Sequence, residues 1–209
     1  MKKILFTITL LVSFLNGNSQ TNAITSEGEE VILYDDGSWS YKINKKINLD
    51  KIETNSDLFR KDTKSTFLVK SNKSKAGVYI NPSKWSFKKA DDDNNDAEYT
   101  FELRDQDLYG QIITERIEIP LESLQTIAIE NFQSVASDAK IVKSEYRNVN
   151  SARVLMIHME GTSQGIPVFF YGYYSNAGGT NQLVLWSMKS LYNEYFEEIQ
   201  EFLNGLVSL

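Results

Sequence analysis

Hydrophobic residues after position 66 fall in short runs separated by Gly, Asn, Asp and Ser, a pattern typical of β-strands joined by turns. Strands are predicted, in chain order, at residues 67–69, 78–80, 85–87, 98–104, 108–117, 141–149, 153–160, 167–174 and 182–188. Within the later strands, residues 154–157 and 168–171 are apolar at every position rather than at every second one. Both faces of their sheet are therefore expected to be covered.

Two helices are predicted to provide this cover. After Pro120, apolar residues recur at helical spacing and form a face made of Leu121, Leu124, Ile127, Ala128, Phe132 and Val135. A C-terminal helix has an apolar face made of Tyr192, Tyr195, Phe196, Ile199, Phe202, Leu203 and Leu206. Its opposite face carries four glutamates, as a solvated face does. The predicted fold class is α+β, an antiparallel sheet flanked by two helices in an α-β-α sandwich.

The chain before residue 66 divides into a β-hairpin element at residues 20–42 and a polar tether at residues 43–65. Asp36-Gly37 lies between two strand-like runs and is a strong signal for a type I′ turn. Residues 23–25 are expected to add a third strand. The tether is rich in Lys, Asn, Asp and Thr, and a short helix is predicted within it at residues 49–60.

The first 19 residues have the pattern of a secretory signal peptide. Lys2 and Lys3 precede an apolar run of 12 residues at positions 4–15, and a small-x-small site at residues 17–19 predicts cleavage before Gln20. A membrane-spanning helix needs about 20 apolar residues, so no span is expected. The mature protein is predicted to be soluble, in the periplasm or outside the cell.

Residues 66–209 resemble the PsbP-like and DcrB-like domains. The resemblance rests on residues 78–85, Val-Tyr-Ile-Asn-Pro-Ser-Lys-Trp, followed by two strands, a helix, a β-meander and a C-terminal helix. It implies the same sandwich fold and a non-enzymatic accessory or binding role. Residues 34–41 are also similar to a hairpin near the start of exported proteins of Bacteroidetes-type bacteria.

Composition excludes several classes of chemistry. The 209 residues contain no Cys and a single His, which excludes thiol catalysis, disulfides and multi-histidine metal sites. The formal net charge is −6, with no basic stripe, so nucleic-acid binding is not expected.

One metal candidate lies in an acidic run. Asp91, Asp93, Asn95 and Glu102 match the oxygen-ligand positions of an EF-hand calcium loop. Asp96, however, occupies the position that needs glycine, and the flanks have strand patterns. The alternative is a solvated acidic hairpin loop, with Glu102 inside a strand.

An aromatic cluster is the candidate ligand-binding surface. It belongs to two successive strands: the first carries Phe169, Phe170, Tyr171, Tyr173 and Tyr174, and the next carries Trp186 and Met188. The candidate ligand-binding residues among them are Phe169, Tyr171, Tyr173 and Trp186. Gly172 and Gly165 leave room for a ligand to approach closely. The alternative is that these aromatic side chains belong to the core of a sheet covered on both faces.

Two further features are assigned structural roles. Residues 161–165 match the G-x-S-x-G motif of serine hydrolases, but they join two strands, and His158 precedes Ser163 rather than following it. We therefore expect a β-turn there, and a hydrogen-bonded core or edge histidine at position 158.

The predicted function is that of an exported, non-enzymatic accessory or binding protein of the cell envelope, with an envelope protein or complex as its partner. The alternative is a periplasmic protein that binds a small molecule or calcium.

Overall fold

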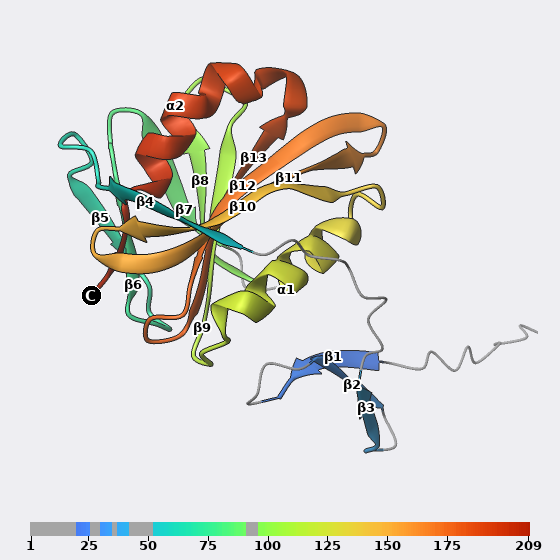
Figure 1. The fold of residues 1–209 in the computed structure, drawn as a ribbon. Helices are drawn as coiled ribbons and strands as arrows, with labels where there is room; N and C mark the ends of the chain where they lie inside the picture. The colour runs from blue at the N-terminus through green and yellow to red at the C-terminus, as the bar shows by residue number, and fades with distance from the viewer. Residues whose placement is uncertain (1–19, 26–29, 35–36, 42–51, 91–95) are drawn as a thin grey trace, which may run out of the picture. The chain divides into compact units, whose positions relative to one another are not determined.

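The computed structural model describes residues 20–25, 30–34, 37–41, 52–90 and 96–209 (Figure 1). The chain divides into two compact units, residues 1–44 and 45–209. The predicted signal peptide lies outside the described residues. No helix in the described part of the chain is long and apolar enough to cross a membrane.

The first unit contains a three-stranded antiparallel sheet of β1 (Gln20–Ile24), β2 (Glu30–Tyr34) and β3 (Trp39–Tyr41). Leu33 pairs with Trp39, and the Tyr34 N–H donates to the Ser38 carbonyl at 2.9 Å. Gly37 has a φ of 81°, which favours glycine. The Gly37 N–H also donates to the Tyr34 carbonyl at 3.0 Å, so three residues separate the paired Tyr34 and Ser38, one more than the predicted type I′ turn has.

The second unit is built on an eight-stranded sheet. In spatial order its strands are β4 (Glu53–Phe59), β10 (Lys140–Val149), β11 (Ala152–Ser163), β12 (Ile166–Ser175), β13 (Thr180–Met188), β9 (Tyr109–Glu115), β8 (Ala97–Leu103) and β7 (Trp85–Lys89). Neighbouring strands are antiparallel except for β4, which runs parallel to β10. Helix α1 (Leu121–Gln133) and helix α2 (Tyr192–Leu203) lie on opposite faces of this sheet (Figure 1).

Alternation along β12 decides which side chains each helix covers. Phe169 faces α2, where its ring contacts Tyr192 at 5.2 Å between centroids. Phe170 points the other way and contacts Phe132 of α1 at 4.3 Å. A strand that is apolar at every position is thus buried on both faces, which confirms the sheet with a helix on each side.

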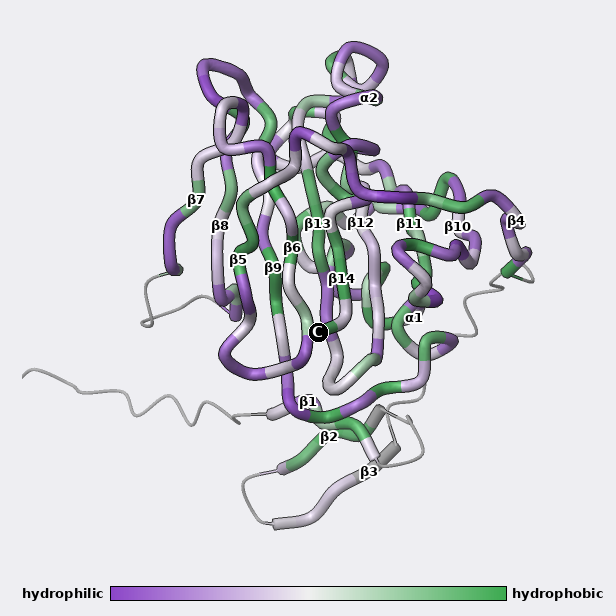
Figure 2. Tube along the Cα trace, turned by 90° about the vertical axis from the view of Figure 1, so that its left-hand side faces the viewer, coloured by the Kyte–Doolittle hydropathy of each residue, from purple (hydrophilic) through white to green (hydrophobic). Residues whose placement is uncertain are grey.

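A second, three-stranded sheet shares the core on the α2 side. It contains β5 (Phe67–Lys70), β6 (Ala76–Ile80) and β14 (Leu206–Ser208), labelled in front of the large sheet in Figure 2. Val78 and Leu206 from this sheet pack in one buried cluster with Leu185 of the large sheet and Phe202 of α2.

The sequence prediction for residues 53–59 is wrong. They form strand β4 of the large sheet rather than a tether with a short helix. Most β4 side chains are exposed and polar, so no hydrophobic alternation marks this strand. Its conformation comes from backbone pairing with β10, reinforced at its end by the Asn150 N–H, which donates to the Phe59 carbonyl at 2.9 Å. The sheet is consequently mixed, with one parallel pair.

The C-terminal helix is also shorter than predicted, because α2 ends at Leu203 and Leu206 belongs to β14. The Gly205 carbonyl accepts a hydrogen bond from the Tyr79 N–H at 2.8 Å. A Cβ at position 205 would lie 2.0 Å from the Tyr79 carbonyl oxygen. Glycine therefore permits the close approach that turns the chain into β14.

A buried carboxylate, Glu98 of β8, stabilises the turn between β5 and β6. It accepts hydrogen bonds from Thr114, from Ser71 at 2.7 Å, and from the backbone and side chain of Asn72. Burial alone would raise the pKa of this carboxyl. The hydrogen bonds outweigh burial and hold that pKa below its ordinary value of 4.5.

We expect Glu98→Gln to lower the free energy of unfolding at pH 7 by about 1–3 kcal/mol, because donors aimed at a carboxylate lose their acceptor. Since the folded-state pKa is depressed, the unfolded chain takes up its proton first as the pH falls below about 4.5. The wild type therefore loses this stabilisation in acid, and the difference in the free energy of unfolding between wild type and Glu98→Gln decreases. Urea unfolding at pH 7 and at lower pH measures both effects.

The matched control is Glu102→Gln, because Glu102 lies on the same strand and is exposed. It should change stability by less than about 0.5 kcal/mol. If the difference in the free energy of unfolding between wild type and Glu98→Gln stayed the same across the acid range, the assigned role of Glu98 would be wrong.

Candidate functional site

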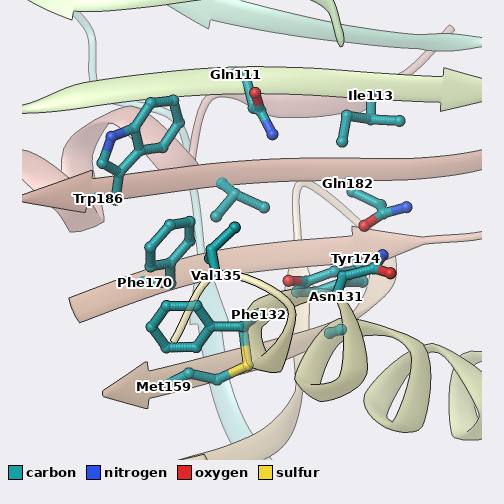
Figure 3. A pocket seen from close by; sticks show the side chains of 12 residues that line it. Gln111, Ile113, Asn131, Phe132, Val135, Met159, Phe170, Tyr174, Gln182 and Trp186 are labelled. Carbon is teal, nitrogen blue, oxygen red and sulfur yellow. The ribbon is translucent and has the colours of Figure 1, made fainter. Parts of the chain in front are cut away.

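A pocket of about 290 Å³ lies between α1 and the face of the large sheet that α1 covers (Figure 3). Helix α1 and the segment that follows it form one wall, and β9, β11, β12 and β13 form the other. The lining residues are Gln111, Ile113, Ala128, Asn131, Phe132, Val135, Met159, Phe170, Tyr174, Gln182, Val184 and Trp186. We call this cavity the α1 pocket.

Strand register brings the sheet residues of the α1 pocket together. Phe170 pairs with Trp186, and Tyr174 pairs with Gln182. Gln111 of β9 lies opposite Val184. Directly paired residues point to the same face, so side chains from four strands converge on one patch.

Gly172 shapes the floor of the pocket between Phe170 and Tyr174. A Cβ at this position would lie 3.1 Å from Cε2 of Tyr174 and 3.1 Å from Cγ2 of Val184. The Tyr174 ring therefore occupies the space that a larger residue would need. Glycine in this strand allows the tyrosine to lie over the backbone beside the cavity.

One side of the pocket is aromatic. The rings of Phe170 and Trp186 stack at 5.8 Å with an interplanar angle of 14°. Phe132 of α1 contacts Phe170, and Tyr109 of β9 extends the row beyond Trp186 at 6.4 Å. We call Phe132, Phe170, Trp186 and Tyr109 the aromatic row.

The other side carries uncharged polar groups. Figure 3 shows Gln182, Tyr174 and Asn131 across the pocket from Trp186 and Phe170. Tyr174 is 2% exposed and Gln182 9% exposed, and neither side chain makes a hydrogen bond to another described residue. Burial raises the pKa of the Tyr174 hydroxyl, so it remains a neutral donor. These groups are available to a ligand.

Val135 marks the mouth of the pocket. The sequence places it on the apolar face of the first helix, but α1 ends at Gln133. The Val135 side chain is 57% exposed and still lines the cavity. It is therefore a position where side-chain size can be changed with little effect on the core.

Of the four aromatic residues predicted to bind a ligand, Trp186 lines the α1 pocket. Phe169, Tyr171 and Tyr173 lie on the opposite face, buried beneath α2. Phe170 alternates with them and takes the place in the pocket. Phe170 lies beside Trp186 because the two residues are paired in the register of β12 and β13. The hydrophobic pattern of the sequence does not predict this register.

Tyr171 and Tyr173 belong to a buried polar network centred on Arg147 of β10, which is 6% exposed. The guanidinium donates to Glu145 at 2.6 Å, to the Tyr173 hydroxyl at 2.8 Å and to the Tyr171 hydroxyl at 3.2 Å. It also donates to the side chain of Gln200 from α2 at 2.7 Å. Burial raises the pKa of Tyr173 to about 12, with Arg147 opposing the rise. This network holds β10 and β12 to α2.

His158 is a core residue, as predicted. Its ring stacks on Tyr192 at 4.4 Å with an interplanar angle of 13°. Burial lowers the pKa of His158, although Glu160 opposes the shift. Its buried Nε2 makes no hydrogen bond to a described residue, so the predicted hydrogen bond is not found at this atom.

The G-x-S-x-G segment is a β-hairpin turn, as predicted. Ser163 ends β11 and pairs with Ile166, the first residue of β12. Gln164 and Gly165 form the two-residue loop, with φ values of 50° and 81°. The strand-to-helix geometry of a hydrolase nucleophile does not occur at this position.

The calcium-loop candidates Asp91, Asp93 and Asn95 lie outside the described residues. Glu102 is exposed within β8, paired with Ser86 and Tyr109, as the strand alternative predicted. Within the described ranges, no three acidic, His or Cys side chains are grouped as metal ligands would be. Calcium binding stays a prediction.

Comparisons with known proteins bear on the fold. No family model and no curated protein matches the chain. The solution structure of cyanobacterial PsbP (CyanoP) from Synechocystis sp. PCC 6803 is similar at a TM-score of 0.51 and 10% identity, covering 68% of this chain and 92% of that one. PA94 of Pseudomonas aeruginosa, a protein of unknown function, reaches a TM-score of 0.43 at 10% identity, with 68% and 96% covered, which is too low to carry weight. The likeness to CyanoP supports the PsbP-like α+β fold expected from the sequence.

Proposed function

We propose that this chain is an exported, non-enzymatic binding protein that holds a small organic molecule in the α1 pocket. One observation carries the proposal. A largely apolar cavity is lined by two polar side chains, Tyr174 and Gln182, which belong to largely buried residues and make no hydrogen bond to a described residue. Polar groups that converge in an apolar pocket and leave their hydrogen-bonding capacity unused are typical of ligand sites.

The size of the pocket restricts the ligand. Sites for small molecules enclose roughly 300–1,000 Å³. At about 290 Å³ the α1 pocket lies at the lower limit of that range. A molecule of one to three rings matches it better than an oligosaccharide or a long acyl chain.

The chemistry of the lining supports binding rather than turnover. Tyr174 is the sole titratable side chain among the twelve lining residues, and burial raises its pKa. General acid–base catalysis needs a group whose pKa lies near the working pH. The pocket offers none, and it offers no activated nucleophile.

A neutral fluorescent probe, N-phenyl-1-naphthylamine, tests the proposal. We expect saturable binding to the wild type and about tenfold or weaker binding to Val135→Trp, because an indole at the mouth would occupy the cavity. Fluorescence titration of the purified protein measures both affinities.

The matched control is Val142→Trp, since Val142 is a similarly exposed valine on β10 that does not line the pocket. It should bind the probe as the wild type does. Absence of saturable binding, or equal binding by Val135→Trp and the wild type, would overturn the proposal.

A further inference from the structure

The α1 pocket lacks any partner for a charged ligand. None of its twelve lining residues is Lys, Arg, His, Asp or Glu. A carboxylate, phosphate or ammonium group entering the cavity would lose its hydration and gain no counter-charge. Fatty acids and charged metabolites are therefore disfavoured on physical grounds.

The polar side of the pocket favours a ligand that both donates and accepts hydrogen bonds. Tyr174 and Gln182 lie side by side as a cross-strand pair. The hydroxyl can donate, and the amide can donate and accept. A purely apolar ligand would bury both groups without partners, so it would bind more weakly than one that carries its own polar group.

The aromatic row favours a flat apolar body on the other side. Phe170 and Trp186 present nearly parallel rings, and Phe132 from α1 packs against the first of them. Met159 also lines this side, and its flexible side chain adapts to the shape of a ligand. Aromatic side chains bind flat rings by edge and offset contacts as well as by area.

We infer that the α1 pocket selects an uncharged molecule with a flat apolar body against the aromatic row and an amide or hydroxyl group against Tyr174 and Gln182. This inference rests on the proposed function and adds the chemical class of the ligand.

Two matched pairs of probes test the class. N-phenyl-1-naphthylamine and 8-anilinonaphthalene-1-sulfonate share one aromatic body and differ by a sulfonate. The neutral probe is expected to bind about tenfold or more tightly, because the sulfonate has no counter-charge. Gln111→Lys, which adds a cation at a partly exposed lining position, should shift that ratio toward the sulfonate.

The second pair tests the polar side of the pocket. We expect 1-naphthamide to displace N-phenyl-1-naphthylamine at a concentration about tenfold lower than 1-methylnaphthalene requires. This difference between the two competitors should largely disappear in Tyr174→Phe. This variant should fold normally, since the Tyr174 hydroxyl makes no hydrogen bond to a described residue.

The outcomes separate the two claims. If no probe binds saturably, the proposed function fails and the inference fails with it. If the sulfonate binds as tightly as the neutral probe, and Val135→Trp blocks both, the pocket is a binding site and the inferred class is wrong. Equal competition by the amide and the hydrocarbon would likewise overturn the inferred polar group.

Discussion

Replacing Arg147 by methionine is expected to lower the free energy of unfolding by about 3–5 kcal/mol. The guanidinium is buried between strand β10 and helix α2 and donates to four side chains, including the carboxylate of Glu145. Its Cζ atom also lies 4.4 Å from the centre of the Phe59 ring. Methionine fills much of the volume but leaves Glu145 with less compensation in a buried position. Urea unfolding at neutral pH measures the loss.

The control for Arg147→Met is Lys143→Met. Lys143 contacts the same carboxylate at 2.8 Å, but its side chain is exposed. Surface ion pairs contribute about 0–1 kcal/mol, so this variant should remain close to the wild type in stability.

A double variant separates the charge from the packing. Arg147→Met combined with Glu145→Met removes both members of the buried pair, which leaves no uncompensated charge. It should be more stable than Arg147→Met alone. A double variant that is as unstable as the single one would show that packing, and not charge compensation, accounts for the role of Arg147.

The strands from β10 to β13 and the two helices could be predicted because their hydrophobic patterns are produced by burial. Residues 154–157 and 168–171 are apolar at consecutive positions because both faces of their strands are covered. Helix α1 covers one face, and α2 together with the three-stranded sheet of β5, β6 and β14 covers the other. Strand β4 carries no such signal. Its exposed polar side chains do not report the backbone pairing with β10 that makes it a strand.

The pocket was harder to foresee than the core. An aromatic cluster on β12 was evident, yet whether Phe169 or Phe170 faces the cavity depends on which side of the sheet α1 covers. That choice, and the pairing of Phe170 with Trp186, are properties of the assembled sheet. No sequence motif marks Gln111 and Gln182 as site residues, because only the folded sheet brings them to one apolar cavity.

A chain that begins at residue 52 should retain the stability of the second unit, whereas one that begins at residue 66 should lose about 2–4 kcal/mol. The longer truncation removes β4 and with it the Phe59 ring over Arg147 and the Asn55 side chain, which donates to Glu145 at 3.2 Å. Each lost hydrogen bond contributes about 1 kcal/mol and the cation–π contact about as much.

Thermal unfolding distinguishes the two truncations. For a chain of this size, 1 kcal/mol corresponds to a shift of roughly 2–4 °C in Tm. The chain from residue 66 should therefore unfold about 4–16 °C below the chain from residue 52. Equal midpoints would mean that β4 contributes nothing to the fold.

The same pair of chains bears on the predicted envelope partner. The chain from residue 52 keeps β4 and all twelve residues of the α1 pocket, so its affinity for N-phenyl-1-naphthylamine should equal that of residues 20–209. A partner bound by residues 20–209 but not by the chain from residue 52 would then have to depend on residues 20–51. Loss of the partner only on truncation to residue 66 would instead trace binding to residues 52–65. This segment contains β4, which forms an edge of the large sheet because it pairs with β10 alone among the described strands.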